Sequence, residues 1–161
     1  MDVETLGGNK YFVLFIDDAT KKVWIYLLRS NDQVFRYFLQ FHAMVERETG
    51  RKLKCLRSDN ESEYTSRDFE TYYTKNGIKH EKTFPGTPQH NGVAKRMDHT
   101  IIERVRCILK ITKLSKAFWG EAAQTAYYLI DRSPSRPLNF EVLEKAWIGK
   151  NVSYSHLRAF G

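Results

Sequence analysis

A single aspartate stands at the most chemically suggestive place in this sequence. The segment KLKCLRS (52–58) has the pattern of a short β-strand, and Asp59 follows it directly. Sites in open α/β sheets gather beyond the carboxyl ends of the strands. A lone aspartate at such a point is also a common turn-former or helix cap. The position therefore makes Asp59 a candidate catalytic carboxylate and leaves the capping interpretation open.

Other familiar site patterns are missing from the sequence. It contains no glycine-rich phosphate loop and no serine-nucleophile elbow. The five histidines lack metal-ligand spacing, and His90 and His99 are better explained as polar surface groups. Cys55 and Cys107 are too far apart for a zinc half-site and too few for a disulfide framework. We expect both to be reduced core residues of an intracellular protein, and no apolar run is long enough to span a membrane.

The charge of the chain points to a polyanionic partner. Lysine and arginine outnumber aspartate and glutamate by 26 to 19, which gives a net charge of +7. Nucleic acid is a common polyanion for basic proteins to bind, although solubility alone also explains a basic surface. A long helix is predicted over residues 91–113, and its spacing puts one mostly basic set on a single face. That set is Lys95, His99, Glu103, Arg106 and Lys110, with Arg96 beside it.

The elements that would position these residues are a mixture of short strands and longer helices. Two apolar runs, 11–17 and 23–28, predict a β-hairpin, and the spacing after Ser30 predicts a helix that ends at Gly50. The remaining predictions are the strand 52–58, a helix from Ser66 to Gly77, an edge strand over 78–83, a mobile loop over 84–92, the helix 91–113, a helix over 115–131 and a semi-extended connector. Strands followed by helices around one sheet predict an α/β or α+β fold in three layers.

Five segments in a fixed order resemble one protein family. They are YFVLFIDDATKKVWIYLL, LKCLRSDNESEY, TPQHNGVAKR, FWGEAAQTAYYLIDRSP and SHLRAFG, and together they extend over nearly all of the chain. The sequence resembles the integrase region of Copia-type long-terminal-repeat retrotransposon polyproteins. The resemblance implies a ribonuclease H-like fold, with a mixed sheet flanked by helices. It also implies insertion of element DNA into target DNA by phosphodiester attack, in the nucleus.

The implied reaction uses two divalent metal ions, Mg²⁺ or Mn²⁺, held by two aspartates and a glutamate. Two such ions, about 3.5–4 Å apart, clamp the attacking and leaving oxygens, and they prefer oxygen ligands such as carboxylates. By resemblance the second aspartate is Asp59, within RSDN. The glutamate follows after thirty-five intervening residues, and this sequence has Lys95 there. A lysine at that position removes a ligand and opposes cation binding with its own charge.

The first aspartate of the family also lacks a counterpart in this chain. By resemblance it lies on a strand just before the segment LGGNKYF, and Met1 falls a few residues after that strand. We therefore expect the sheet to lack its first, central strand. From the residues alone Asp17 would be the first ligand, so it remains the alternative. Asp59 is then the one retained family ligand, and we expect it to bind metal weakly at best.

These observations predict an integrase core over residues 1–132 and a connector and tail over 133–161 that continue toward the rest of a polyprotein. We expect this copy to be catalytically inactive. One alternative is an active metal-dependent nuclease or strand transferase that uses Asp17 and Asp59. Another is a DNA-binding module without catalysis. From the missing strand we also expect strand-edge association or a homodimer that supplies the missing pairing. The residues expected to contact DNA are Gln89, Asn91, Lys95, Arg96, His99, Arg106 and Lys110.

Overall fold

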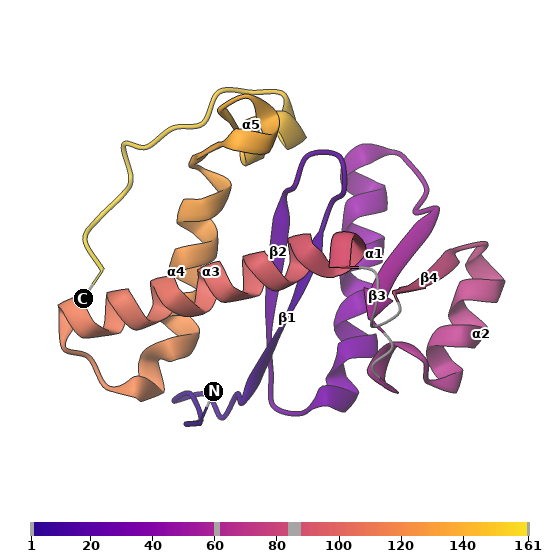
Figure 1. Cartoon of the computed structure of the whole chain (residues 1–161), viewed down its shortest axis with the longest axis horizontal. Coiled ribbons are helices and arrows are strands. Elements are labelled where there is room, and N and C mark those ends of the chain that lie inside the picture. Colours follow the sequence, from indigo (N-terminus) through magenta and orange to yellow (C-terminus); the bar gives the residue numbers. More distant parts are fainter. Residues whose placement is uncertain (1, 60–61, 84–87, 161) are drawn as a thin grey trace. The chain divides into compact units, whose positions relative to one another are not determined.

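The computed structural model describes residues 2–59, 62–83 and 88–160, which form two compact units. Unit 1 comprises Met1–Leu27 and Arg96–Gly161, and unit 2 comprises Leu28–Lys95. Up to residue 131 the strands and longer helices follow one another in the predicted order (Figure 1). The strands form three two-stranded sheets, with the pairs β1–β2, β3–β4 and β5–β6. The expectation of a missing central strand stays a prediction.

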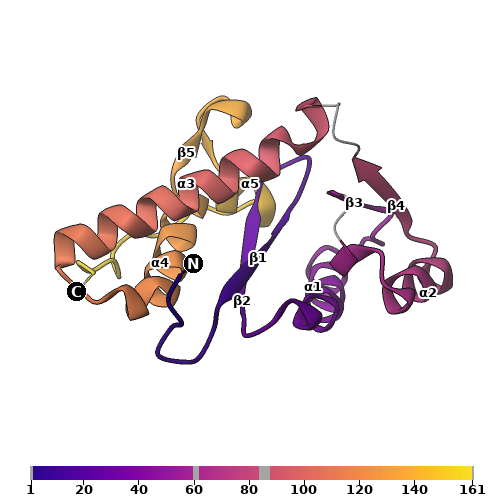
Figure 2. The same cartoon turned by 60° about the horizontal axis from the view of Figure 1, so that its bottom comes forward.

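Unit 1 is built around the predicted hairpin of β1 (Tyr11–Ile16) and β2 (Val23–Leu28). Its helices are the main part of α3 (Pro88–Thr112), α4 (Trp119–Asp131) and α5 (Leu143–Ile148). Helix α3 crosses α4 in both views of the chain (Figures 1 and 2). Apolar side chains of the hairpin pack against one buried core that these helices share. The core comprises Ile101, Val105, Trp119, Ala122, Ala123, Ile130 and Leu143.

A buried charge cluster joins three elements of unit 1. Lys22, just before β2, places its Nζ atom 2.7 Å from Oδ2 of Asp131 at the end of α4, and it also pairs with Glu144 on α5. The other oxygen of Asp131 accepts a hydrogen bond from the backbone N–H of Val23 (3.3 Å). Asp131 is fully buried and Lys22 is 5% exposed. Because burial disfavours a carboxylate, it raises the pKa of Asp131, and the ammonium and amide compensate for part of that cost.

Unit 2 places two helices on one side of a parallel pair of strands (Figure 2). The strands are β3 (Cys55–Asp59) and β4 (Lys79–Thr83). The helices are α1 (Val34–Thr49) and α2 (Arg67–Asn76), which end at Gly50 and Gly77 as predicted. Both glycines have a φ of 65°, a left-handed conformation that other residues adopt only with strain. Aromatic rings form the contact between the helices, with Phe38, Phe69 and Tyr73 buried.

Three expectations for the termini of elements and for the core need correction. Helix α3 begins at Pro88, so residues 88–92 of the predicted loop are helical, while residues 84–87 lie outside the described chain. Proline suits this position because the first helical N–H has no intrahelical partner. In the segment read as a connector, β5 (Pro134–Ser135) and β6 (Glu141–Val142) form an antiparallel pair before α5.

Cys55 and Cys107 are both exposed, which contradicts their assignment to the core. In a β-strand successive side chains point to opposite faces. The apolar residues near Cys55 in the sequence do not show which of the two faces its side chain occupies. The predicted boundary at residue 132 stays a prediction. No helix in the described parts of the chain combines the length and the apolar character needed to cross a bilayer.

We predict that Lys22→Met lowers the free energy of unfolding by about 3–5 kcal/mol, because it leaves the buried Asp131 carboxylate without its cation. Chemical denaturation of the purified chain measures the effect. The matched control is Lys10→Met, which removes a lysine that pairs with Glu4 on the surface (3.0 Å) and should cost less than about 1 kcal/mol. Equal losses for the two variants would show that the buried cluster contributes nothing beyond a surface pair.

Candidate nucleic-acid and metal site

Asp59 lies where the sequence placed it, at the carboxyl end of β3 in unit 2. In the parallel register its Cα atom is paired with that of Thr83, the last residue of β4. The hydroxyl of Thr83 donates to the backbone carbonyl of Ser58 (3.2 Å), which ties the two strand ends together. The Asp59 side chain is half-buried. The fold therefore holds this carboxylate at a fixed strand end, where open α/β sheets place their sites.

A histidine that the sequence did not single out adjoins this strand end. Nε2 of His80, on β4, lies 2.8 Å from Oγ of Ser58, and that hydroxyl donates to the Asp59 carbonyl (3.0 Å). Since the hydroxyl proton goes to the carbonyl, Nε2–H must be the donor at the imidazole. Position 80 could not be recognised in advance, because the pairing register of β3 and β4 decides which side chains meet.

The surroundings of His80 favour the neutral form of its imidazole. Its side chain is 6% exposed and packs against the ring of Tyr73, with 4.7 Å between centroids. Nδ1 is buried without a hydrogen-bond partner among the described residues, and the nearest carboxylate oxygen, on Glu70, is 4.0 Å away. Burial lowers the pKa of His80 below its usual 6.5; Lys82 lowers it further, and Glu70 opposes them.

The described residues around Asp59 do not fit a divalent-metal centre. Mg²⁺ and Mn²⁺ need several oxygen ligands, usually with two or more carboxylates among them. Within the described ranges, no three His, Cys, Asp or Glu side chains come together in a way that could hold a metal ion. The acidic neighbours on the strand and helix are engaged elsewhere: Glu81 pairs with Arg57 and Lys79, and Glu70 with Lys82.

Asp17, the alternative ligand, belongs to unit 1 and shapes the turn of the hairpin. Its Oδ2 atom accepts hydrogen bonds from the backbone N–H and the hydroxyl of Thr20, both at 2.8 Å. Its backbone carbonyl accepts from the N–H of Lys21, whose φ of 61° completes the tight turn. This is the ordinary turn-forming role of aspartate. Its use as a metal ligand stays a prediction.

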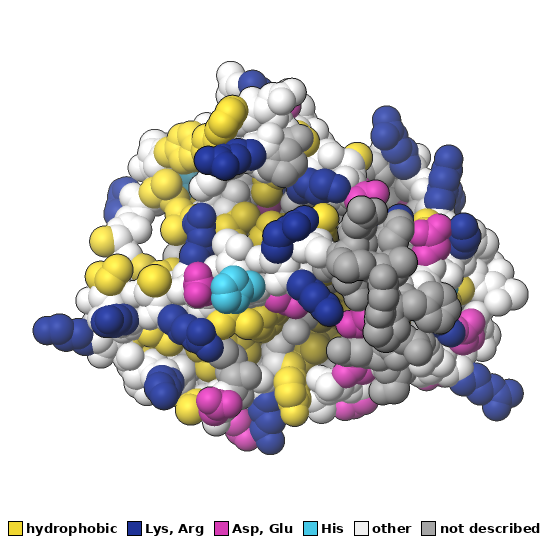
Figure 3. All heavy atoms as spheres, viewed as in Figure 1, with side chains coloured by type: hydrophobic (Ala, Val, Ile, Leu, Met, Phe, Trp, Pro, Cys, Tyr) yellow, Lys and Arg dark blue, Asp and Glu magenta, His cyan; other side chains and the backbone are white. Residues whose placement is uncertain are grey.

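The outer face of α3 carries the basic residues that the helical spacing predicted. Lys95, Arg96, Arg106 and Lys110 are exposed, and within the described chain none of them has an ion-pair partner. His99 and Glu103 are also exposed, and Nε2 of the histidine lies 3.4 Å from Oε1 of the glutamate. Figure 3 shows Lys and Arg side chains along the surface over α3. Gln89 and Asn91 lie in the first turns of the helix, and their side chains fall outside the described part.

Burial of the opposite stripe of α3 fixes this orientation. Ile101 and Val105 are almost completely buried in the core of unit 1, and Met97 and Ile108 pack against that core. Because side chains three and four residues apart share one helix face, the basic positions must then point to solvent. The resulting surface can attract phosphate groups, and it presents several cations on one helix.

Comparison with known proteins identifies related sequences. The family described as Integrase core domain matches residues 1–88. The chain is 66% identical, over all 161 residues, to the Retrovirus-related Pol polyprotein from transposon TNT 1-94 of Nicotiana tabacum. It is 32% identical, over 152 residues, to the Retrovirus-related Pol polyprotein from transposon RE1 of Arabidopsis thaliana. The matches cover 100% and 94% of the chain but 12% and 10% of the two polyproteins, so the chain spans a small part of these relatives.

Solved structures with the same fold come from retroviruses. The HTLV-2 integrase catalytic core domain in complex with magnesium has a TM-score of 0.64 and 16% identity, covering 83% of this chain and 82% of that one. A simian T-cell lymphotropic virus intasome in complex with PP2A regulatory subunit B56 gamma has a TM-score of 0.67 and 14% identity, covering 93% and 51%. These similarities confirm the ribonuclease H-like fold predicted from the sequence.

We predict that acid destabilises unit 2 through His80. Its pKa is lower in the folded chain than in the unfolded chain, so the unfolded state binds more protons as the pH falls. The contribution of His80 to stability is therefore complete above about pH 6.5 and is lost as the pH falls through the folded pKa. Denaturation midpoints at pH 7.5 and pH 5 should differ less for His80→Gln than for the wild type. His99→Gln, at an exposed position, should behave as wild type; an unaltered pH dependence in His80→Gln would refute the assignment.

Proposed function

This chain belongs to the integrase core domain family, and on that premise we propose that it is a DNA-binding integrase core that does not catalyse strand transfer. The observation that carries the proposal is the lysine at position 95, where the family resemblance places the third carboxylate ligand. Lys95 is exposed on α3 and has no ion-pair partner in the described chain that would neutralise its charge. The chain spans a small part of its polyprotein relatives. Any role in DNA integration that it shares with those whole polyproteins is therefore also part of this proposal.

A lysine weakens a metal site more than the loss of a ligand alone does, because its positive charge repels the cation. In-line displacement at phosphorus depends on cations that stabilise the attacking and leaving oxygens. At an effective dielectric constant of about 20, an ammonium about 4 Å from a metal ion is repelled by about 4 kcal/mol for each unit of metal charge. Asp59 supplies one carboxylate against this repulsion. We infer that divalent metal binds here no better than at an ordinary surface carboxylate.

The same substitution favours DNA binding. A lysine in place of a glutamate converts a group that repels phosphate into one that attracts it. Arg96 and Arg106 are ten residues apart, about 15 Å along the helix axis, so the unpaired cations extend over more than one phosphate spacing. Contacts of this kind hold a protein on DNA without reading base sequence. Binding of this kind would take place on chromosomal DNA, and we therefore propose a nuclear location.

We predict that the chain does not nick supercoiled plasmid DNA in the presence of Mg²⁺ or Mn²⁺. Titration calorimetry should give weak Mg²⁺ binding without a two-ion isotherm, and Lys95→Glu should strengthen that binding, because it replaces a repulsive charge by a ligand. Lys110→Glu introduces the same charge change on the same helix and should leave metal binding unchanged. Metal-dependent nicking by the wild type that disappears in Asp59→Asn would overturn the proposal and favour the active alternative.

We predict that Arg96→Gln, Arg106→Gln and Lys110→Gln together weaken binding to duplex DNA of any sequence. Each lost phosphate contact should reduce the slope of log affinity against log salt concentration by about one unit. Fluorescence anisotropy at several salt concentrations measures both quantities. The matched control neutralises Lys52, Lys54 and Lys75, three exposed lysines of unit 2 that lie outside α3. If the two triple variants bind DNA equally, the basic face of α3 serves solubility alone.

A further inference from the structure

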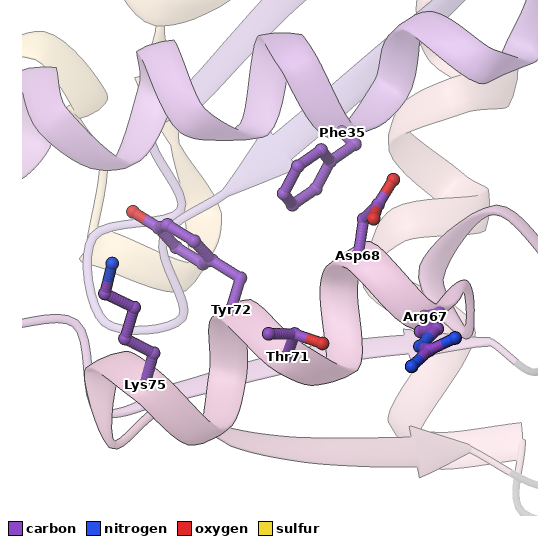
Figure 4. Close-up of a pocket in the computed structure, with 6 residues that line it drawn as sticks. All are labelled: Phe35, Arg67, Asp68, Thr71, Tyr72 and Lys75. Carbon is purple, nitrogen blue, oxygen red and sulfur yellow. The ribbon is translucent and has the colours of Figure 1, made fainter.

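A small hollow lies between α1 and α2 of unit 2 (Figure 4). Its volume is about 260 Å³. Phe35 of α1 forms one wall, and the rest comes from α2: Arg67, Asp68, Thr71, Tyr72 and Lys75. Figure 4 shows Tyr72 and Lys75 at one end and Arg67 at the other, with Phe35, Asp68 and Thr71 between them. Because cofactors and drug-sized ligands occupy about 300–1,000 Å³, this hollow suits one large side chain better.

Hydrogen bonds to α1 hold the Tyr72 ring, which forms part of the aromatic wall of the hollow. The hydroxyl of Tyr72 is hydrogen-bonded to Nδ1 of His42, a buried residue of α1 (2.7 Å). Oε1 of Glu46 lies 3.1 Å from Nε2 of the same ring and accepts a hydrogen bond from the backbone N–H of Leu53 (3.1 Å). That N–H, together with His42, keeps the pKa of Glu46 below its usual range. The Tyr72 ring, perpendicular to Phe35 at 5.9 Å, is therefore fixed before any ligand arrives.

The charges around the hollow are unpaired. Arg67, Asp68 and Lys75 are exposed, and in the described chain none of the three has an ion-pair partner. Arg67 and Lys75 are eight residues apart on α2, which separates their backbone positions by about 12 Å. Asp68 lies between these cations. A carboxylate in that place repels the phosphates of DNA but can accept hydrogen bonds from the N–H groups of a peptide.

We propose that this hollow docks an acidic peptide segment of a partner protein, with one large apolar side chain seated over Phe35 and Tyr72. In an extended peptide two acidic residues four positions apart are separated by about 13 Å, which matches the spacing of Arg67 and Lys75. The central residue of the same peptide then points between the cations, over the two rings. Aromatic anchors flanked by polar pairs are the usual energetic centre of such interfaces. The proposal does not depend on DNA binding by α3.

Anisotropy of a fluorescein-labelled ten-residue peptide tests the site. The peptide carries one phenylalanine with a glutamate two positions before it and another two positions after it, in a Gly-Ser background. We expect saturable binding, weakened at least tenfold by Arg67→Glu with Lys75→Glu, and abolished by Thr71→Trp, which fills the hollow from the exposed face of α2. Thermal unfolding of each variant should match the wild type, because all three positions are exposed.

Two controls separate docking from general attraction between opposite charges. Lys54→Glu, at an exposed lysine of unit 2 outside the hollow, should leave the affinity unchanged. A peptide of the same composition, with the phenylalanine moved to one end, should bind at least tenfold more weakly. Equal binding of the two peptides, or equal binding by wild type and Thr71→Trp, would overturn the proposal. Displacement of the peptide by a 20-base-pair duplex would assign the hollow to nucleic acid instead. The α3 triple variant should bind the peptide normally, so failure of the DNA proposal stays distinguishable.

Discussion

The constraint on which the rest of unit 1 depends is the burial of the Asp131 carboxylate. A charge with no solvent exposure must find its partners within the protein, and here they are the ammonium of Lys22 and the N–H of Val23. These partners come from the start of β2, whereas Asp131 ends α4 and Glu144 belongs to α5. The hairpin, α4 and α5 are thereby fixed to one another by directed bonds, which apolar packing alone does not provide.

A consequence of this packing is the division of α3 into two functional faces. The apolar stripe of α3 packs into the core that it shares with α4 and the hairpin. Because the basic face lies on another side of the helix, it faces solvent. Two kinds of site would use this same helix. One is the family's metal site, which has a carboxylate at position 95, and the other is a surface that binds phosphate. Under the proposed function, exchange of that single side chain would shift the helix from coordination of metal toward retention of DNA, without any change in the fold that supports it.

Local sequence signals predicted where the helices and strands lie better than they predicted which of these elements contact one another. Gly50 and Gly77 end their helices as expected, because a left-handed residue after an apolar period is a local feature. The prolines and glycines of residues 84–92 predict a loop that includes Pro88, although proline is also favoured at the start of a helix. His80 could not be found, because its role depends on a parallel register between strands that are separated by a helix. The hollow beside Tyr72 likewise depends on how α1 and α2 pack. The basic face of α3 was predictable, since helical period alone determines it.

The two cysteines, which are exposed against expectation, are natural attachment points for a pair of spectroscopic labels. Cys107 lies on the part of α3 that belongs to unit 1, and Cys55 begins β3 in unit 2. Burial, with Glu81 nearby, raises the pKa of the Cys55 thiol, so its modification is best carried out at alkaline pH. Spin labels on the unaltered sequence would then measure the separation between the units directly, and would report any change in that separation when DNA or a peptide is added.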